Sequence, residues 1–143
     1  MVMLTGGEKY NTKQLIIKIN EIYPGIKGIV ENDKNPSGSS LNKLYETTLE
    51  IFIGLSTLTV NIIGSSKVLK EVFDSLQEVH YYKDVNSHNK QALIDVSKRI
   101  PELQEELINM VESDTTNRDS VLRQIMDELG IVDPNAKKKR SLW

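Results

Sequence analysis

The clearest hydrophobic pattern in the chain lies between Thr57 and Val79. Leu58, Val60 and Ile62 alternate with polar residues, which is typical of a β-strand with one buried face. After residues 64–66 the apolar positions recur every three or four residues, as on one face of a helix. The sequence therefore predicts a strand, a tight turn and a helix in succession.

The first thirty residues suggest a similar unit. Met1–Leu4 is a short apolar start that fits a strand. Asn11 is placed to cap a helix, which Tyr23-Pro24-Gly25 should end, because proline lacks the N–H that continues the hydrogen-bond ladder. Ile26–Val30 is short and β-leaning. If Met1–Leu4 is also a strand, residues 1–30 form one strand–helix–strand unit.

The middle of the chain can be interpreted in three ways. From Leu41 the apolar positions follow a helical period, yet Leu49 to Leu55 also alternate as a strand would. Residues 47–63 could thus be part of a helix, a strand or a hairpin. We favour a helix that ends near Gly54, because the segment that follows is rich in residues with low helix propensity. The aromatic stretch Val79–Val85 is a candidate for a further strand.

The chain beyond residue 87 has a helical pattern throughout. Its apolar positions step by three and four, which predicts a continuous buried stripe, here called the C-terminal seam: Leu93, Val96, Ile100, Leu103, Leu107 and Met110. Pro101 interrupts this stripe, so two helices should meet at Ile100 or one helix should kink there. A last helix should end at Gly130.

These elements favour an α/β fold, in which helices flank a small, mainly parallel sheet and a helical extension follows. The alternative is an all-α bundle. In the favoured interpretation residues 1–86 form the α/β core, and residues 87–130 form an extension that packs on this core or self-associates. Residues 131–143 form a mobile basic tail.

Composition narrows the class of protein without identifying it. The chain has 143 residues, 27% of them charged, and no cysteine, which fits a small globular domain in a reducing compartment such as the cytoplasm. We see no signal peptide at the N-terminus. The most apolar stretch, Leu49–Ile63, falls short of the ~20 residues that a membrane span needs.

Charge is distributed unevenly along the chain. Residues 101–136 carry nine acidic and two basic residues, whereas Lys137, Lys138, Lys139 and Arg140 form a basic run near the end. An acidic helical region of this kind indicates a solvated or partner-facing surface. The body of the chain has no basic stripe for phosphates, so nucleic acid is not an expected partner.

Two small-residue turns are the candidate ligand-binding residues: Thr5, Gly6 and Gly7, and Gly64, Ser65 and Ser66. In a parallel sheet each turn would join a strand to a helix, where free N–H groups attract a phosphate-bearing ligand. Glycine and serine are equally the residues that build ordinary turns and helix caps. Neither turn matches a known nucleotide-binding motif.

No catalytic or metal-binding constellation is recognisable. His80 and His88 have no cysteine to join and no metal-ligand spacing. Glu102, Glu105, Glu106 and Glu112 fit a solvated helix face better than an acid–base pair. We therefore expect no cofactor and no metal, and we lean against an enzyme.

Four scattered pieces, VMLTGG, IKGIVEND, YYKDVNS and RIPEL, loosely resemble the opening half of formyltransferase-type folds. The catalytic Asn-x-His-Pro-Ser type of stretch is missing, and Asn86-Ser87-His88 lacks its pattern. The resemblance therefore implies no activity.

Three functional hypotheses follow. The first is a non-enzymatic interaction or regulatory module that binds a protein partner or itself through the C-terminal seam. The second is a domain that binds or senses a small phosphate- or nucleotide-bearing ligand through the turns at 5–7 and 64–66. An enzyme is the third and the least supported.

Overall fold

The computed structural model describes residues 4–33, 35–111 and 118–130. These residues form helices and contain no strand, so the predicted α/β fold is wrong and the all-α alternative is the correct class. The helices are α1 (Gly6–Asn32), α2 (Ser39–Ser56), α3 (Val60–Gly64), α4 (Lys67–Val79), α5 (Lys90–Lys98), α6 (Ile100–Val111) and α7 (Arg118–Leu129).

The predicted strand at Thr57–Ile63 is instead the junction of two helices. Thr57 ends α2, and its N–H donates to the carbonyl of Gly54 at 3.1 Å. Thr59 caps α3, because its hydroxyl oxygen accepts from the N–H of Ile62 at 3.3 Å. The threonines that suggested alternation are therefore helix-terminal residues. Val60, which we expected to be buried in a sheet, is 87% exposed.

Helix α1 begins earlier and ends later than the sequence suggested. Its cap is Thr5, not Asn11, and Thr5 and Glu8 form a reciprocal capping box. The helix runs through Pro24 to Asn32, so Ile26–Val30 is helical and not a strand. Proline removes one helical hydrogen bond, a cost that is offset here because the turn after it buries Ile26 completely.

The C-terminal helices agree better with the sequence. As predicted, two helices meet at Ile100: α5 ends at Lys98, and Pro101 lies in the first turn of α6, where its missing N–H is tolerated. Gly130 follows α7 with a positive φ of 72°, which is the predicted glycine stop. The candidate strand Val79–Val85 is wrong, because it consists of the end of α4 and a series of turns.

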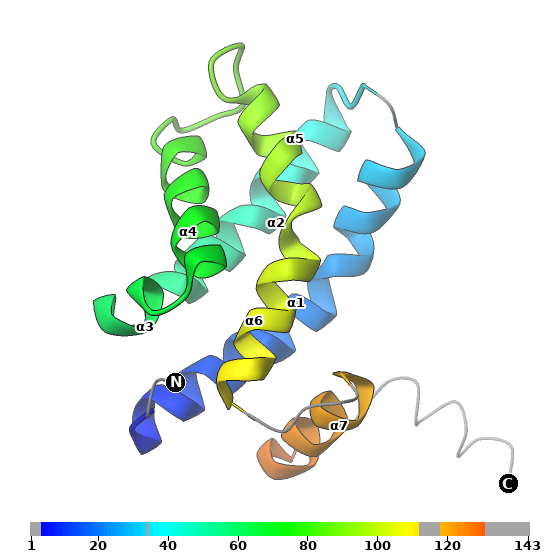
Figure 1. The fold of residues 1–143 in the computed structure, drawn as a ribbon. Coiled ribbons are helices and arrows are strands. Elements are labelled where there is room, and N and C mark those ends of the chain that lie inside the picture. The colour runs from blue at the N-terminus through cyan, green and yellow to red at the C-terminus, as the bar shows by residue number, and fades with distance from the viewer. Residues whose placement is uncertain (1–3, 34, 112–117, 131–143) are drawn as a thin grey trace, which may run out of the picture.

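Figure 1 shows α5 and α6 following one another along the front of the molecule, with α4 on one side and α1 on the other. Helix α1 packs against α2 and α6, and α4 packs against α5. Helices on both sides of the predicted boundary at residues 86–87 contribute to one hydrophobic core. The described residues of the four formyltransferase-like pieces lie in helices, turns and loops and include no strand.

The predicted mobile tail, residues 131–143, lies outside the described residues, as do Met1–Met3 and Glu112. Of the helices that the structure describes, none combines the length and the apolar character needed to cross a membrane.

Candidate functional site

The first predicted turn is the N-terminus of α1. There the N–H of Thr5 donates to the carboxylate of Glu8 at 2.9 Å, and the hydroxyl of Thr59 donates to the same carboxylate at 2.9 Å. These bonds, that from the Thr5 backbone above all, lower the pKa of Glu8. Gly6 and Gly7 therefore sit beside a carboxylate that remains ionised. A second anion would meet a like charge there, which disfavours the predicted phosphate site at this turn.

The second predicted turn joins α3 to α4. The hydroxyl of Ser65 donates to the carbonyl of Ile62 at 2.6 Å, and that of Ser66 accepts from the N–H of Leu69 at 3.3 Å. Gly64 is exposed, whereas Ser66 is buried as the cap of α4. Both hydroxyls thus have local structural roles, and ligand binding at this turn stays a prediction.

The C-terminal seam contacts the core of its own chain. Leu93, Val96, Ile100, Leu103 and Leu107 are at most 2% exposed, and Met110 is half-buried against the same core. On the outer side, Glu102 and Glu105 are exposed and Glu106 is half-buried. An interface role for the seam stays a prediction, but in the folded chain its side chains offer little surface to a partner.

His80 lies at the end of α4 among aromatic side chains from α2. Its ring meets Tyr45 edge-on, with centroids 4.6 Å apart, and stacks on Phe52 at 5.9 Å. Nε2 lies 3.0 Å from the hydroxyl of Thr48, while the buried Nδ1 has no hydrogen-bond partner among the described residues. Burial lowers the pKa of His80 to about 4. The imidazole is therefore a neutral packing group at neutral pH.

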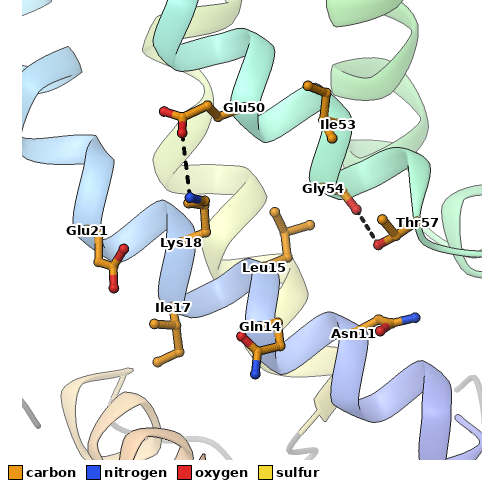
Figure 2. Close-up of a pocket in the computed structure, with 10 residues that line it drawn as sticks. All are labelled: Asn11, Gln14, Leu15, Ile17, Lys18, Glu21, Glu50, Ile53, Gly54 and Thr57. Atoms are coloured by element: carbon orange, nitrogen blue, oxygen red, sulfur yellow. Dashed lines mark hydrogen bonds and ion pairs between the residues drawn. The ribbon is translucent and has the colours of Figure 1, made fainter. Parts of the chain in front are cut away.

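No group of three or more potential metal ligands occurs in the described parts of the chain. Three of the hollows on the described surface are large enough to hold a ligand or a side chain. The first, of about 380 Å³, lies between α1 and α2. Figure 2 shows Lys18 of α1 reaching toward Glu50 of α2, an ion pair of 3.5 Å, and Leu15 below Gly54. The lining is a mixture of amides, charged groups, aliphatic groups and the hydroxyl of Thr57, which donates to the carbonyl of Gly54, and these lining residues match no recognised catalytic arrangement.

The second hollow, here called the α3 groove, has a volume of about 370 Å³ and lies among α2, α3 and α4. It is the most apolar of the three, and its lining consists of Leu55, Ser56, Leu58, Val60, Ile63, Gly64, Lys70 and Phe73. Leu55 is fully buried, while Val60 projects at the edge with 87% of its surface exposed. One cation, Lys70, stands at the rim.

The third hollow, here called the tyrosine pocket, has a volume of about 410 Å³. Its lining combines acidic and aromatic side chains: Asp74, Gln77, Glu78, Tyr81, Tyr82, His88 and Asn89. The rings of Tyr81 and Tyr82 are nearly perpendicular at 87°, with centroids 5.3 Å apart, and Tyr82 stacks on His88 at 5.9 Å.

Hydrogen bonds from side chains to the backbone fix the loop that carries these tyrosines. The buried side chain of Asn89 donates from Nδ2 to the carbonyls of Val79 and Asp84, both at 3.0 Å. Its Oδ1 accepts from the N–H of Asn86 at 2.7 Å. The hydroxyl of Tyr45 donates to the carbonyl of Tyr82. These hydrogen bonds therefore hold the loop that forms the tyrosine pocket in one conformation.

Helix α4 connects the α3 groove to the tyrosine pocket. Lys70 and Phe73 line the first, and Asp74 and Gln77 line the second. These residues lie three or four positions apart and so share one side of the helix. Lys70 and Asp74 also form an ion pair of 2.8 Å across the boundary between the two hollows.

Comparison with protein-family models, curated proteins and solved structures gives no match. Sequence reasoning missed both hollows on α4. Only the unusual cluster of Tyr81 and Tyr82 was a visible signal, and it was interpreted as part of a strand.

Proposed function

We propose that the protein is a non-enzymatic docking module that binds an amphipathic helix of another protein in the α3 groove. This keeps the interaction function predicted from the sequence but transfers it to a different surface, because five of the six seam residues are buried in the chain's own core.

The observation that carries the proposal is the exposure of Val60 at the edge of an apolar groove. Single exposed aliphatic residues are common and need no explanation. Val60 differs because it continues a surface formed by Leu58, Ile63 and Phe73, so that apolar side chains of α3, of α4 and of the turn before α3 form one concave patch. Covering such a patch removes apolar area from water, which stabilises the complex by roughly 25 cal/mol for each Å² of apolar surface buried.

The polarity of the groove, which is apolar with one cation in its lining, suits an amphipathic helix as the occupant. A helix that enters an apolar groove presents side chains spaced by three, four and seven residues, and its opposite face stays in water. Lys70 at the rim could pair with an acidic residue on the outer side of such a helix.

A second copy of the chain is a poor occupant. Such a copy would have to offer a row of exposed apolar side chains on one helix. The large apolar residues exposed in the described chain are Tyr10, Ile53, Val60, Tyr81 and Tyr82. They lie on α1, α2, α3 and the loop after α4, so the described helices offer no such row. We therefore propose a different protein as the partner.

A selection from a library of helical peptides, displayed against the intact protein, tests this proposal. We expect enriched peptides with apolar residues at positions i, i+3 or i+4, and i+7. Val60→Glu should weaken their binding by at least about tenfold, because the new carboxylate would have to lose its hydration in a largely apolar groove. Since Val60 is 87% exposed, this variant should fold normally, which circular dichroism verifies.

Asn42→Glu is the matched control, because Asn42 is an exposed residue of α2 outside the groove and the change adds the same single charge. The control should bind the selected peptides like the wild type. Failure to enrich any such pattern, or equal binding by Val60→Glu, would refute the proposal. A wild-type dimer in light scattering that Val60→Glu dissociates would show that the occupant is a second copy instead.

A further inference from the structure

We infer that the tyrosine pocket binds a cationic side chain, a guanidinium or an ammonium group, carried by the same partner segment that fills the α3 groove. The inference rests on the proposed docking function, which it extends by assigning a charge and a position to one residue of the partner.

The aromatic geometry supports a cation. The face of a tyrosine ring is electron-rich and attracts a positive group that lies within about 6 Å of its centroid. Tyr81 and Tyr82 stand at 87° to one another, so they form two walls of a corner. Tyr81 is 82% exposed, which leaves its ring available to a ligand.

The charges that line the pocket are both negative. Glu78 is exposed on the last turn of α4 and has no ion-pair partner among the described residues. Asp74 is paired with Lys70 at 2.8 Å, but both side chains are about half exposed, so a second cation could share or replace this pair. A positive group in the corner would thus meet the exposed ring of Tyr81, lie beside the ring of Tyr82 and meet one unpaired carboxylate.

The position of the pocket links it to the α3 groove. From Lys70, at the rim of the groove, to Gln77, in the pocket, α4 rises over seven residues, or roughly 10 Å at 1.5 Å per residue. A helical segment that lies along α4 would span this distance in two turns. We therefore place the basic residue of the partner about seven positions from its apolar anchor.

Nuclear magnetic resonance can test the pocket separately from the groove. The probe is N-acetyl-arginine N-methylamide, which has no apolar anchor and so does not depend on the α3 groove. Its neutral control is the matching citrulline derivative. We expect the arginine probe to shift the ring signals of Tyr81 and Tyr82, and the citrulline probe to leave them unchanged.

Variants then identify the source of the affinity. Tyr81→Leu keeps an apolar side chain but loses the ring, and should weaken the arginine probe by about two- to fivefold. Glu78→Gln should weaken it by a similar factor, and added salt should reduce the difference between this variant and the wild type. Tyr81→Phe keeps the ring face and should bind like the wild type.

Absence of any shift with the arginine probe, or equal shifts with the citrulline probe, would overturn the inference while leaving the α3 groove untested by this experiment.

The basic run Lys137–Arg140 must also be examined, because its side chains carry the cationic groups that the pocket is proposed to bind. If replacing these four residues by glutamine shifts the Tyr81 signals in the free protein, the cation comes from this chain and the partner version is wrong.

Discussion

At the scale of single residues, His80 shows how a polar side chain can serve only for packing. The hydroxyl of Thr48 lies 2.8 Å from the carbonyl of Leu44, to which it donates, so it accepts from Nε2–H of His80. The proton of the neutral ring is then on Nε2, and Nδ1 is buried without a partner among the described residues. A second proton would be placed on an atom that has no acceptor and little water.

This arrangement predicts a stability that depends on pH. The pKa of His80 in the folded protein, about 4, is below its usual unfolded value of 6.5, so the unfolded chain binds the proton more readily. The contribution to stability is complete above pH 6.5 and is lost as the pH falls toward 4. Thermal melts of the wild type and His80→Gln across this range should show a steeper fall for the wild type. Parallel pH profiles would contradict this account of His80.

At the scale of elements, the sequence predicted helices reliably where burial followed a helical period. The helix expected to end near Gly54 ends at Ser56, and the break at Ile100 is where Pro101 indicated. Prediction failed at the ends of helices. The threonines that flank Leu58 looked like the polar face of a strand, and Pro24 looked like a stop although Ile26 continues the buried stripe of α1.

The candidate site could not be predicted for a related reason. The α3 groove combines Leu55, Val60 and Phe73, which belong to three different helices joined by two short turns. Periodicity describes one element at a time, so it assigns each of these residues to a buried face. That Val60 lies outside the core follows only from how α3 packs against α4.

The contact between α1 and α2 gives a prediction at this scale. A Cβ on Gly54 would lie 2.5 Å from Cδ1 of the buried Leu15, whereas one on Gly28, also inside a helix, would meet nothing within 4 Å. Gly28→Ala should raise the free energy of unfolding by up to about 1 kcal/mol through helix propensity. The free energy of unfolding of Gly54→Ala should be about 1–3 kcal/mol lower than that of Gly28→Ala, because Leu15 must move. Urea unfolding of both variants measures these free energies. An equal increase in the free energy of unfolding for both variants would refute the close packing of Gly54 against Leu15.

At the scale of the whole molecule, one core connects the two halves of the sequence. Leu103 of α6 is fully buried, and the neighbouring Gln104 donates from Nε2 to the carbonyl of Ile16 on α1 at 3.0 Å. Among the acidic residues that the structure describes in this part of the chain, Glu102, Glu105 and Asp127 are exposed, on helices whose inner side completes the core.

Leu103→Ala separates a core role from an interface role. If Leu103 fills the core of its own chain, its truncation should lower the free energy of unfolding by about 2–5 kcal/mol. The oligomeric state should not change. Chemical unfolding and light scattering of the same variant report the two quantities. A dimer that dissociates in Leu103→Ala while the monomer keeps its stability would assign the C-terminal seam to an interface.

Docking in the α3 groove requires apolar surface to be buried, and the heat capacity change of binding measures this burial directly. Calorimetric titration of a selected helical peptide at several temperatures should give a negative heat capacity change with the wild type and with Asn42→Glu, because apolar surface leaves water. Val60→Glu should bind at least about tenfold more weakly. A heat capacity change near zero, or an unchanged affinity for Val60→Glu, would contradict docking in the α3 groove.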